Sequence, residues 1–167
     1  MKNIFIAHIT FEAKTALKIG SKNADFLQDS PIQKDWNGLP MILGTSLTGV
    51  LRKEFEDEIA KNIFGTGDLG SKTIISNALI LNEKKEVTES LLLDSKKSDF
   101  LQKFIVLPIR EHNAMNDKGV TKDTGKFDEE VIYKGTRFKF SIEMINETQE
   151  DKNNFFHLLD LLSQNSF

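Results

Sequence analysis

Residues 26–55, FLQDSPIQKDWNGLPMILGTSLTGVLRKEF, place a long loop directly before an amphipathic helix. The stretch holds two of the chain's three prolines, and proline interrupts helices and central strands. From Thr45 onward, apolar residues recur every three or four positions, the period of one helix face. We therefore predict a helix that begins at Thr45, its N-cap, and ends at the glycines of FGTGDLG, residues 64–70. Its apolar face holds Leu47, Val50, Leu51, Phe55, Ile59 and Ile63.

Strand-like segments precede and follow this helix. Residues 3–20, NIFIAHITFEAKTALKIG, alternate with apolar side chains on both faces, so we predict a strand well inside a sheet, with His8 packed in it. KTIISNALILN, residues 72–82, and VIYKGTRFKFSIEMI, residues 131–145, are rich in β-branched and aromatic residues, as strands are.

A second amphipathic helix is predicted over ETQEDKNNFFHLLDLLSQ, residues 147–164, with Thr148 or Asn146 as its cap. Residues 84–104 fit either a loop or a short helix, and a polar excursion separates the last two strands. The order β-α-β-β-α predicts an α+β fold with an antiparallel sheet, a ferredoxin-like plan without its final strand. Because sheet edges are rarely left unpaired, we expect that the chain is cut after Phe167 or that another segment supplies this strand.

Length and composition exclude several classes of protein. The chain has 167 residues, the length of one domain, and no cysteine, which excludes disulfides and thiolate metal sites. His8, Glu12 and Lys14 interrupt the N-terminal segment before a signal-peptide core forms. No apolar run approaches the roughly 18 residues that a membrane span needs. We therefore expect a cytoplasmic protein with no membrane partner.

The charge is unevenly distributed along the chain. The formal net charge is −3, yet residues 14–53 carry six cationic and three acidic side chains. Residues 141–167 carry five acidic side chains and one lysine. Since the local field decides where a polyanion binds, a basic groove is compatible with an acidic chain. A solvated surface with randomly clustered charges explains the same pattern.

The segment GTSLTG, residues 44–49, has the composition of a phosphate-binding helix start. Backbone N–H groups at a helix N-terminus, together with the helix dipole, bind anions without many lysines. Gly44 and Gly49 would let a phosphate approach the backbone, and Thr45, Ser46 and Thr48 offer hydroxyl donors. Ordinary helix capping explains the same residues.

Four stretches in order share the pattern of a known family. They are LKIGSKNADFLQDSPIQKDWNGLPMILGTSLTGVLRKEFE (17–56), IFGTGDLGSKTIISNALIL (63–81), IREHNAMNDKGVTKDTGKFDEEVIYKGTRFKF (109–140) and FFHLLDLLSQNSF (155–167). Together they resemble the signature of the RAMP superfamily, which includes the repeated backbone subunits of type III (Csm/Cmr-like) CRISPR effector complexes. The resemblance spans nearly the whole chain.

The sequence departs from this signature at identifiable positions. Thr48 stands where the family commonly has lysine, and Leu43 where it often has proline. The glycine-rich loop that the family carries after the last helix would follow Phe167 and is absent from the sequence. The first two changes make the helix start less basic and less rigid.

The resemblance implies a modified RRM-like fold that spans residues 1–167 as a single domain, incomplete at its C-terminus. It implies a subunit that binds guide RNA and target RNA and assembles with other RAMP subunits, including copies of itself. Residues 108–130 match the β-hairpin thumb that family members insert into the guide–target duplex. The candidate RNA-binding residues are Lys18, Lys22, Gly44, Thr45, Ser46, Arg52, Arg110, His112 and Lys118.

Asp29 matches the family position that supports metal-dependent cleavage of target RNA. A carboxylate is the ligand that Mg²⁺ or another divalent cation prefers, so the resemblance implies Asp29 as both the catalytic and the metal-binding residue. An ordinary turn is the alternative, since Asp-Ser-Pro is common turn chemistry. Asp25 and Asp35 are close enough in the sequence to be rivals.

Three other functions remain open on the sequence. A non-catalytic structural RAMP subunit shares every feature except activity at Asp29. A guide-precursor processing endoribonuclease of the same superfamily would use histidine or tyrosine as acid and base, and the chain's one tyrosine, Tyr133, falls in a predicted strand. An α+β domain of unrelated function would share only the fold.

Overall fold

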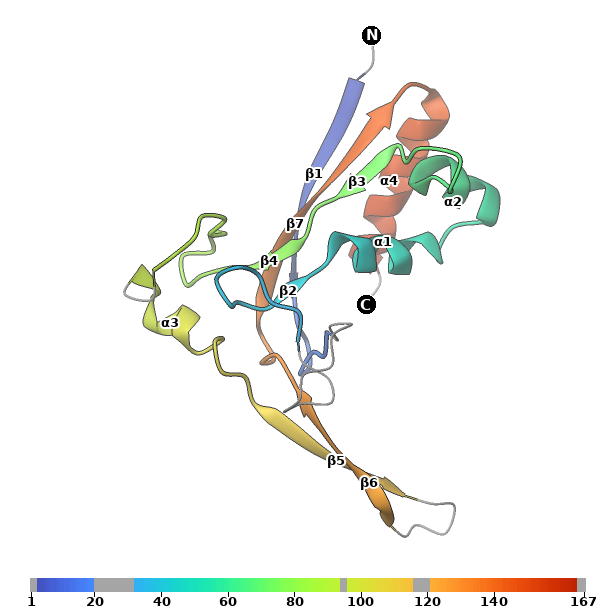
Figure 1. The fold of residues 1–167 in the computed structure, drawn as a ribbon. Helices are drawn as coiled ribbons and strands as arrows, with labels where there is room; N and C mark the ends of the chain where they lie inside the picture. The colour runs from blue at the N-terminus through green and yellow to red at the C-terminus, as the bar shows by residue number, and fades with distance from the viewer. Residues whose placement is uncertain (1–2, 20–31, 94–95, 116–120, 165–167) are drawn as a thin grey trace. The chain divides into compact units, whose positions relative to one another are not determined.

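The structure is a computed structural model that describes residues 3–19, 32–93, 96–115 and 121–164, with the side chains of 112–128 outside the description. The chain divides into two compact units. Unit 1 comprises Met1–Ile9, Ile42–Ala78 and Phe140–Phe167, and unit 2 comprises Thr10–Met41 and Leu79–Lys139. In chain order the elements are β1 (Asn3–Glu12), β2 (Met41–Ile42), α1 (Gly44–Arg52), α2 (Asp57–Phe64), β3 (Thr73–Ile75), β4 (Ala78–Ile80), α3 (Asp99–Gln102), β5 (Ile109–Met115), β6 (Thr121–Glu130), β7 (Arg137–Asn146) and α4 (Gln149–Gln164) (Figure 1).

The main sheet has the strand order β1-β7-β4-β2, with β3 also paired to β7. Strands β3 and β4 both run antiparallel to β7, with Ile74 opposite Glu143 and Leu79 opposite Lys139. Strand β7 therefore lies between the first strand and β4, the place that the third strand takes in a ferredoxin-like sheet. The prediction of an α+β fold with an antiparallel sheet is confirmed.

Strand β7 supplies the most regular part of the core. Its even-numbered side chains, Phe138, Phe140, Ile142 and Met144, are at most 4% exposed, and its odd-numbered side chains face outward. The alternation is strict from Arg137 to Met144, and it fixes which face of the strand is buried.

Strand β1 corrects one expectation from the sequence. It is an edge strand of the described sheet and does not lie well inside it. Phe5 packs on Phe155 of α4 with ring centroids 5.3 Å apart, whereas Ile4 and Ile6 on the other face are 59% and 57% exposed. His8 shares that exposed face, so the prediction that it is packed is wrong. The apolar residues on both faces misled the prediction, because α4 covers only the face that carries Phe5.

The predicted helix from Thr45 is two helices in unit 1. Helix α1 begins one residue earlier, with Leu43 as its N-cap and no side-chain capping bond. After Arg52, backbone bonds such as that from Lys53 N to Val50 O (3.1 Å) tighten the chain into 3₁₀-like turns. Phe55 in this break is buried and contacts Phe64 at 5.7 Å between ring centroids. Helix α2 ends at the glycines, as predicted, with Gly65 at φ +76° as its C-cap.

The predicted strand over residues 72–82 is also interrupted. Ser76 and Asn77 separate β3 from β4, and the side chains of both accept hydrogen bonds from backbone N–H groups of other segments. The N–H of Ser141 donates to Ser76 Oγ (2.8 Å), and the N–H of Gly44 donates to Asn77 Oδ1 (2.9 Å). These two polar side chains therefore join the strand break to β7 and to the start of α1.

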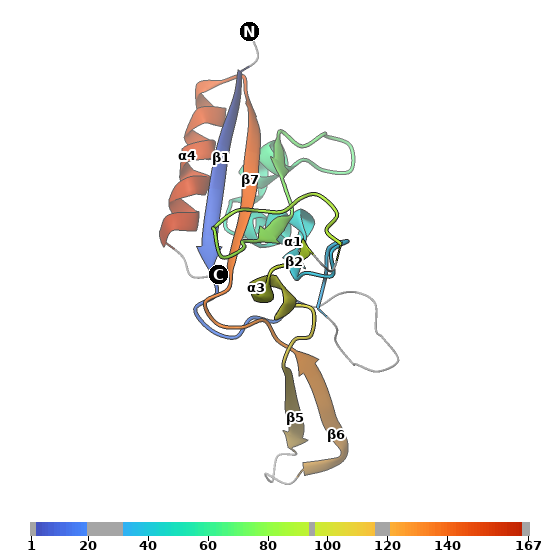
Figure 2. The same cartoon turned by 90° about the vertical axis from the view of Figure 1, so that its left-hand side faces the viewer.

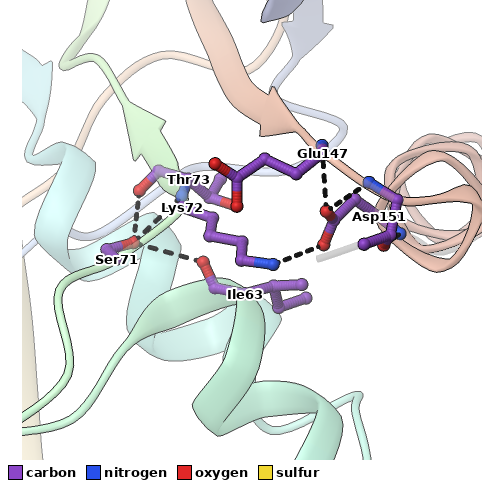
Figure 3. Close-up of polar contacts among 7 residues, drawn as sticks. Ile63, Ser71, Lys72, Thr73, Glu147 and Asp151 are labelled. Atoms are coloured by element: carbon purple, nitrogen blue, oxygen red, sulfur yellow. Dashed lines mark hydrogen bonds and ion pairs between the residues drawn. The ribbon is translucent and has the colours of Figure 1, made fainter. Parts of the chain in front are cut away.

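A buried ionic cluster fixes the start of α4 in unit 1 (Figure 3). Asp151 is fully buried; its Oδ1 accepts a bond from Lys72 Nζ (2.8 Å), and its Oδ2 accepts from the N–H groups of Glu147 (3.1 Å) and Thr148 (3.0 Å). Thr148 Oγ1 accepts from the N–H of Asp151 in return (3.1 Å), so the pair forms a reciprocal capping box. Of the two predicted caps, the structure uses Thr148.

Unit 2 contains α3 and the two-stranded β5–β6 sheet (Figure 2). Residues 84–104, ambiguous on the sequence, include the single-turn helix α3, which Ser98 Oγ caps by accepting from the N–H of Leu101. The polar excursion pairs from Ile109 opposite Glu130 to Met115 opposite Thr121, with an irregularity after Asn113. No helix in the described part of the chain is long and apolar enough to cross a membrane.

The tight packing of Gly44 predicts opposite effects of alanine at two positions of α1. A Cβ on Gly44 would lie 2.1 Å from the Ile75 carbonyl oxygen, whereas a Cβ on Gly49 meets nothing within 4 Å. Gly44→Ala should lower the free energy of unfolding in urea by about 1–3 kcal/mol. Gly49→Ala should raise it by about 0.5–1 kcal/mol, because alanine favours a helix interior. Equal effects would contradict the packing described for Gly44.

The Asp151 cluster predicts a stability that depends on acid. Burial raises the pKa of Asp151, but the bonds from Lys72 and from the Glu147 and Thr148 backbone outweigh burial and leave it below its ordinary value. A lowered folded-state pKa stabilises the fold above the unfolded-state pKa of about 3.9, and this contribution is lost as the pH falls through the folded-state value. The free energy of unfolding of Asp151→Asn, measured in urea, should therefore fall less than that of the wild type as the pH is lowered below about 4.

At neutral pH, Asp151→Ala should cost about 1–3 kcal/mol of unfolding free energy, because it leaves buried N–H donors and the Lys72 ammonium without their acceptor. Asp160 on the exposed side of the same helix is the matched control. Asp160→Ala should change the free energy by less than about 0.5 kcal/mol. The assignment fails if the two alanine variants are equally stable.

Candidate nucleic-acid interface

The start of α1 keeps only part of the phosphate site that its composition suggests. The N–H of Gly44 is bonded to Asn77, the N–H of Ser46 donates to Leu43 O (3.0 Å), and the Thr48 hydroxyl donates to Gly44 O (2.8 Å). Thr45 and Ser46 are exposed, and the first turn of α1 holds no acidic residue. What this helix start offers an anion is therefore the hydroxyl groups of Thr45 and Ser46 at the positive end of the helix dipole.

Arg52 connects α1 to the C-terminus of α2 in unit 1. Its Nη1 donates to the carbonyl oxygen of Gly65, 2.8 Å away, at the C-terminus of α2. The pKa of Asp57 lies below its ordinary value, mainly because Lys61 donates a hydrogen bond to it, and the charge of Arg52 contributes in the same direction. One N–H group of Arg52 is thus bonded within the protein, and its positive charge also acts on the carboxylate of Asp57.

Lys18 and Arg110 both lie at the base of the β5–β6 hairpin in unit 2. Lys18 Nζ forms an ion pair with Glu129, although 111 positions separate them in the chain. Arg110 on β5 lies directly opposite Glu129 on β6 in the antiparallel register. Side chains at opposed positions extend to the same face of a two-stranded sheet. The structure therefore gathers two of the predicted RNA-binding residues at the base of the β5–β6 hairpin.

The neighbouring carboxylate of Glu130 holds the segment that returns from the first loop. Glu130 is 6% exposed and accepts a bond from the N–H of Ile32 (3.0 Å). Lys34 Nζ lies 3.5 Å from the same carboxylate and donates to Ile105 O at 3.3 Å. Lys18 precedes the loop and Ile32 follows it, so consecutive acids of β6 hold the chain on both sides of residues 20–31.

Asp35 has a structural role. Its Oδ1 accepts bonds from the N–H groups of Asn37 (2.8 Å) and Leu39 (2.9 Å), which closes the turn before β2. Asn37, buried in this turn, donates to Ser90 O (3.0 Å) and accepts from the N–H of Leu92 (2.7 Å). The two bonds that Asp35 accepts give this aspartate a structural reason to stand in the turn.

Several predicted residues lie outside what the structure describes. Lys22, Asp29 and Lys118 are among the residues left out, and so are Asp25 and the side chain of His112. The described residues contain no group of three His, Asp or Glu side chains able to hold a metal ion. The role of Asp29 and its divalent cation therefore remains a prediction from the family resemblance.

The predicted residues separate into two groups. Gly44, Thr45, Ser46 and Arg52 belong to unit 1, whereas Lys18 and Arg110 belong to unit 2. Sequence reasoning missed Glu129 and Glu130, which end a polar run and carry no local pattern. Their partners lie about a hundred positions away, and only a pairing between distant segments would have identified them.

The fold is similar to chains of solved CRISPR complexes. A chain of the type III-B Cmr-beta complex in its apo state, determined by cryo-electron microscopy, matches with a TM-score of 0.69 and 14% identity, covering 94% of this chain and 90% of that chain. A chain of the type III-B Cmr-beta complex bound to cognate target RNA matches with a TM-score of 0.66 and 14% identity, covering 90% and 87%. A chain of a type IV-B CRISPR complex matches with a TM-score of 0.60 and 16% identity, covering 95% and 81%.

Sequence comparison gives the family directly. No curated protein matches the chain in sequence. The model of the RAMP superfamily matches residues 10–167, a range that includes every candidate site residue predicted from the sequence. This match covers nearly the whole chain, and the chain belongs to the RAMP superfamily.

Proposed function

We propose that the chain is a guide-RNA-binding backbone subunit of a type III CRISPR effector complex. The observation that carries the proposal is the fold match to a chain of the type III-B Cmr-beta complex over 94% of this chain. Membership of the RAMP superfamily and the match to a chain of the complex with cognate target RNA support it. Its partners are then guide RNA, target RNA and other RAMP subunits, including copies of itself, in the cytoplasm.

The base of the β5–β6 hairpin is the proposed phosphate-binding surface of unit 2. Glu129 holds the Lys18 ammonium on the face of the hairpin that carries Arg110. Arg110 is exposed, and its guanidinium can donate two parallel hydrogen bonds to a phosphate. Contacts to phosphates fix the position of an RNA strand without reading its bases. A subunit that binds guides of many sequences requires this type of contact.

The hairpin itself, within residues 108–130, is the proposed thumb. Its two strands pair from Ile109 opposite Glu130 to Met115 opposite Thr121. The exposed hydroxyl groups of Thr45 and Ser46 at the start of α1 provide a second, weaker phosphate site in unit 1. Arg52 adds to it only with the donor groups that Gly65 does not use.

Removal of one cation tests the binding surface. Arg110→Gln, in the complex purified through a tag on the full-length chain, should weaken the affinity for RNA. It should also reduce the slope of log affinity against log salt concentration by about one for each copy of the subunit that contacts the RNA. Fluorescence anisotropy with labelled target RNA at several salt concentrations measures both quantities.

Lys84→Gln is the matched control, because Lys84 is an exposed cation in a turn remote in sequence from the hairpin. It should leave the affinity and the salt slope unchanged. If Arg110→Gln behaves as this control does, the base of the hairpin is not an RNA-binding surface.

Asp29 is the proposed catalytic residue for cleavage of target RNA, with Mg²⁺ or another divalent cation as its cofactor. A bound divalent cation stabilises the charge that develops on a phosphodiester. Asp29 would supply a carboxylate to hold it, and Glu129 and Glu130 hold described residues on either side of it in the sequence, Lys18 by an ion pair and Ile32 by a backbone hydrogen bond. Binding depends on many phosphate contacts, so it does not need this carboxylate.

The Asp29→Ala variant separates the binding of target RNA from its cleavage. The assembled complex with this variant should bind target RNA as tightly as the wild type, and its cleavage rate with magnesium should fall about a hundredfold or more. Gel shifts and single-turnover cleavage measure the two properties. Wild-type cleavage by the variant would contradict the assignment and favour a non-catalytic structural subunit.

Asp35→Ala is the informative comparison, because the structure assigns that carboxylate to a turn. It should lower the thermal stability of the chain without a selective loss of cleavage. Loss of cleavage in Asp35→Ala alone, with normal stability, would move the catalytic site to Asp35.

A further inference from the structure

Unit 2 contains a cavity that shares no residue with the surface described above. It has a volume of about 230 Å³ and lies between α3 and the turn that leads into β7. Phe100, Phe104 and Tyr133 provide its aromatic wall, and Lys103 and Lys134 lie beside them. The turn is held by the N–H of Gly135, which donates to Ala13 O at 2.7 Å.

The three aromatic rings form one connected group. Phe104 is 5% exposed and lies between the others, with ring centroids 5.3 Å from Phe100 and 5.8 Å from Tyr133. Phe104 and Tyr133 meet edge to face, at 81° between ring planes. Tyr133 is 43% exposed, so a ring that packs on the buried Phe104 presents part of its surface to solvent. Such a ring loses little conformational freedom when a planar ligand stacks on it.

The charge around the cavity favours an anionic ligand. Both lining lysines are exposed, and neither forms an ion pair within the described residues. Among the described residues that line the cavity none is acidic, although the chain as a whole has a net charge of −3. Two cations beside aromatic rings match a ligand that has both a planar ring and a negative charge.

The size and the hydrogen bonding of the cavity narrow the ligand further. Pockets for drug-sized ligands begin at about 300 Å³, so this cavity of about 230 Å³ fits about one ring system. The hydroxyl of Thr136 in its lining donates to Tyr133 O at 2.7 Å, so its proton is not available to donate to a base edge. Stacking without hydrogen-bond readout tolerates all four bases.

We propose that this cavity binds one unpaired nucleotide of an RNA strand. The base stacks on Tyr133, and the ammonium groups of Lys103 and Lys134 contact the flanking phosphates. The inference rests on the proposed function for the presence of RNA, but it assigns a separate site with its own residues.

Cross-linking in the intact complex tests the site directly. The complex is purified through a tag on the full-length chain, bound to target RNA in which 4-thiouridine replaces uridine, irradiated and digested for mass spectrometry. The peptide that contains Tyr133 should carry a cross-linked nucleotide, and Tyr133→Ala should abolish this cross-link. Tyr133→Phe should retain it, because the ring and not the hydroxyl makes the stack.

Affinity provides a second measurement with a matched control. Tyr133→Ala should weaken RNA binding about fivefold or more, whereas Tyr133→Phe should bind as the wild type does. Lys103→Gln combined with Lys134→Gln should reduce the salt dependence of binding. Lys84→Gln combined with Lys96→Gln removes the same charge elsewhere in unit 2 and should leave that dependence unchanged.

The outcomes separate this site from the proposed function. A guide RNA that copurifies with the complex, while the wild-type Tyr133 peptide stays free of cross-links, would overturn the site and leave the function standing. Loss of a neighbouring protein from the Tyr133→Ala complex, with RNA affinity unchanged, would assign the cavity to a protein partner and also overturn the proposal. Purification without any RNA would instead contradict the proposed function.

Discussion

The alternation of side chains along β7 is the constraint on which both compact units depend. Residues 140–146 of this strand belong to unit 1 and residues 137–139 to unit 2, and the same even-numbered face is buried from Phe138 to Met144. A shift of register by one residue would expose Phe138, Phe140, Ile142 and Met144 together, so only one register is compatible with a core. The turn at Tyr133 precedes this strand and the cap of α4 follows it.

Much of this architecture could be predicted, because period-two and helical spacing are local properties of the sequence. The strand over β7, the helix capped by Thr148 and the helix end at Gly65 all follow from patterns within a few residues. The strand break at Ser76 and Asn77 could not be predicted, because it depends on bonds to Ser141 and Gly44 in other elements. The outer position of β1 was missed for a similar reason, since apolar residues on both faces do not reveal which face a helix covers.

The candidate site was less predictable than the fold. Cationic residues could be proposed for RNA binding from charge and family resemblance, but their internal partners could not. Arg52 donates to a carbonyl and Lys18 pairs with Glu129, and both contacts join segments that are separate in the sequence. A cation that is bonded within the protein helps to position the segments that it joins. An exposed cation such as Arg110 remains able to bind a phosphate.

In the proposed function, the chain would present cations at the hairpin base, and its affinity for RNA would come from repetition along the strand more than from any single copy. The most direct test of this account is the content of the complex purified through a tag on the full-length chain. Extraction and sequencing of its RNA, with native mass spectrometry of the protein, should find guide RNA with repeat-derived sequence and several copies of this chain on each RNA. A protein that purifies without nucleic acid, or as one copy bound to unrelated cellular RNA, would contradict the account.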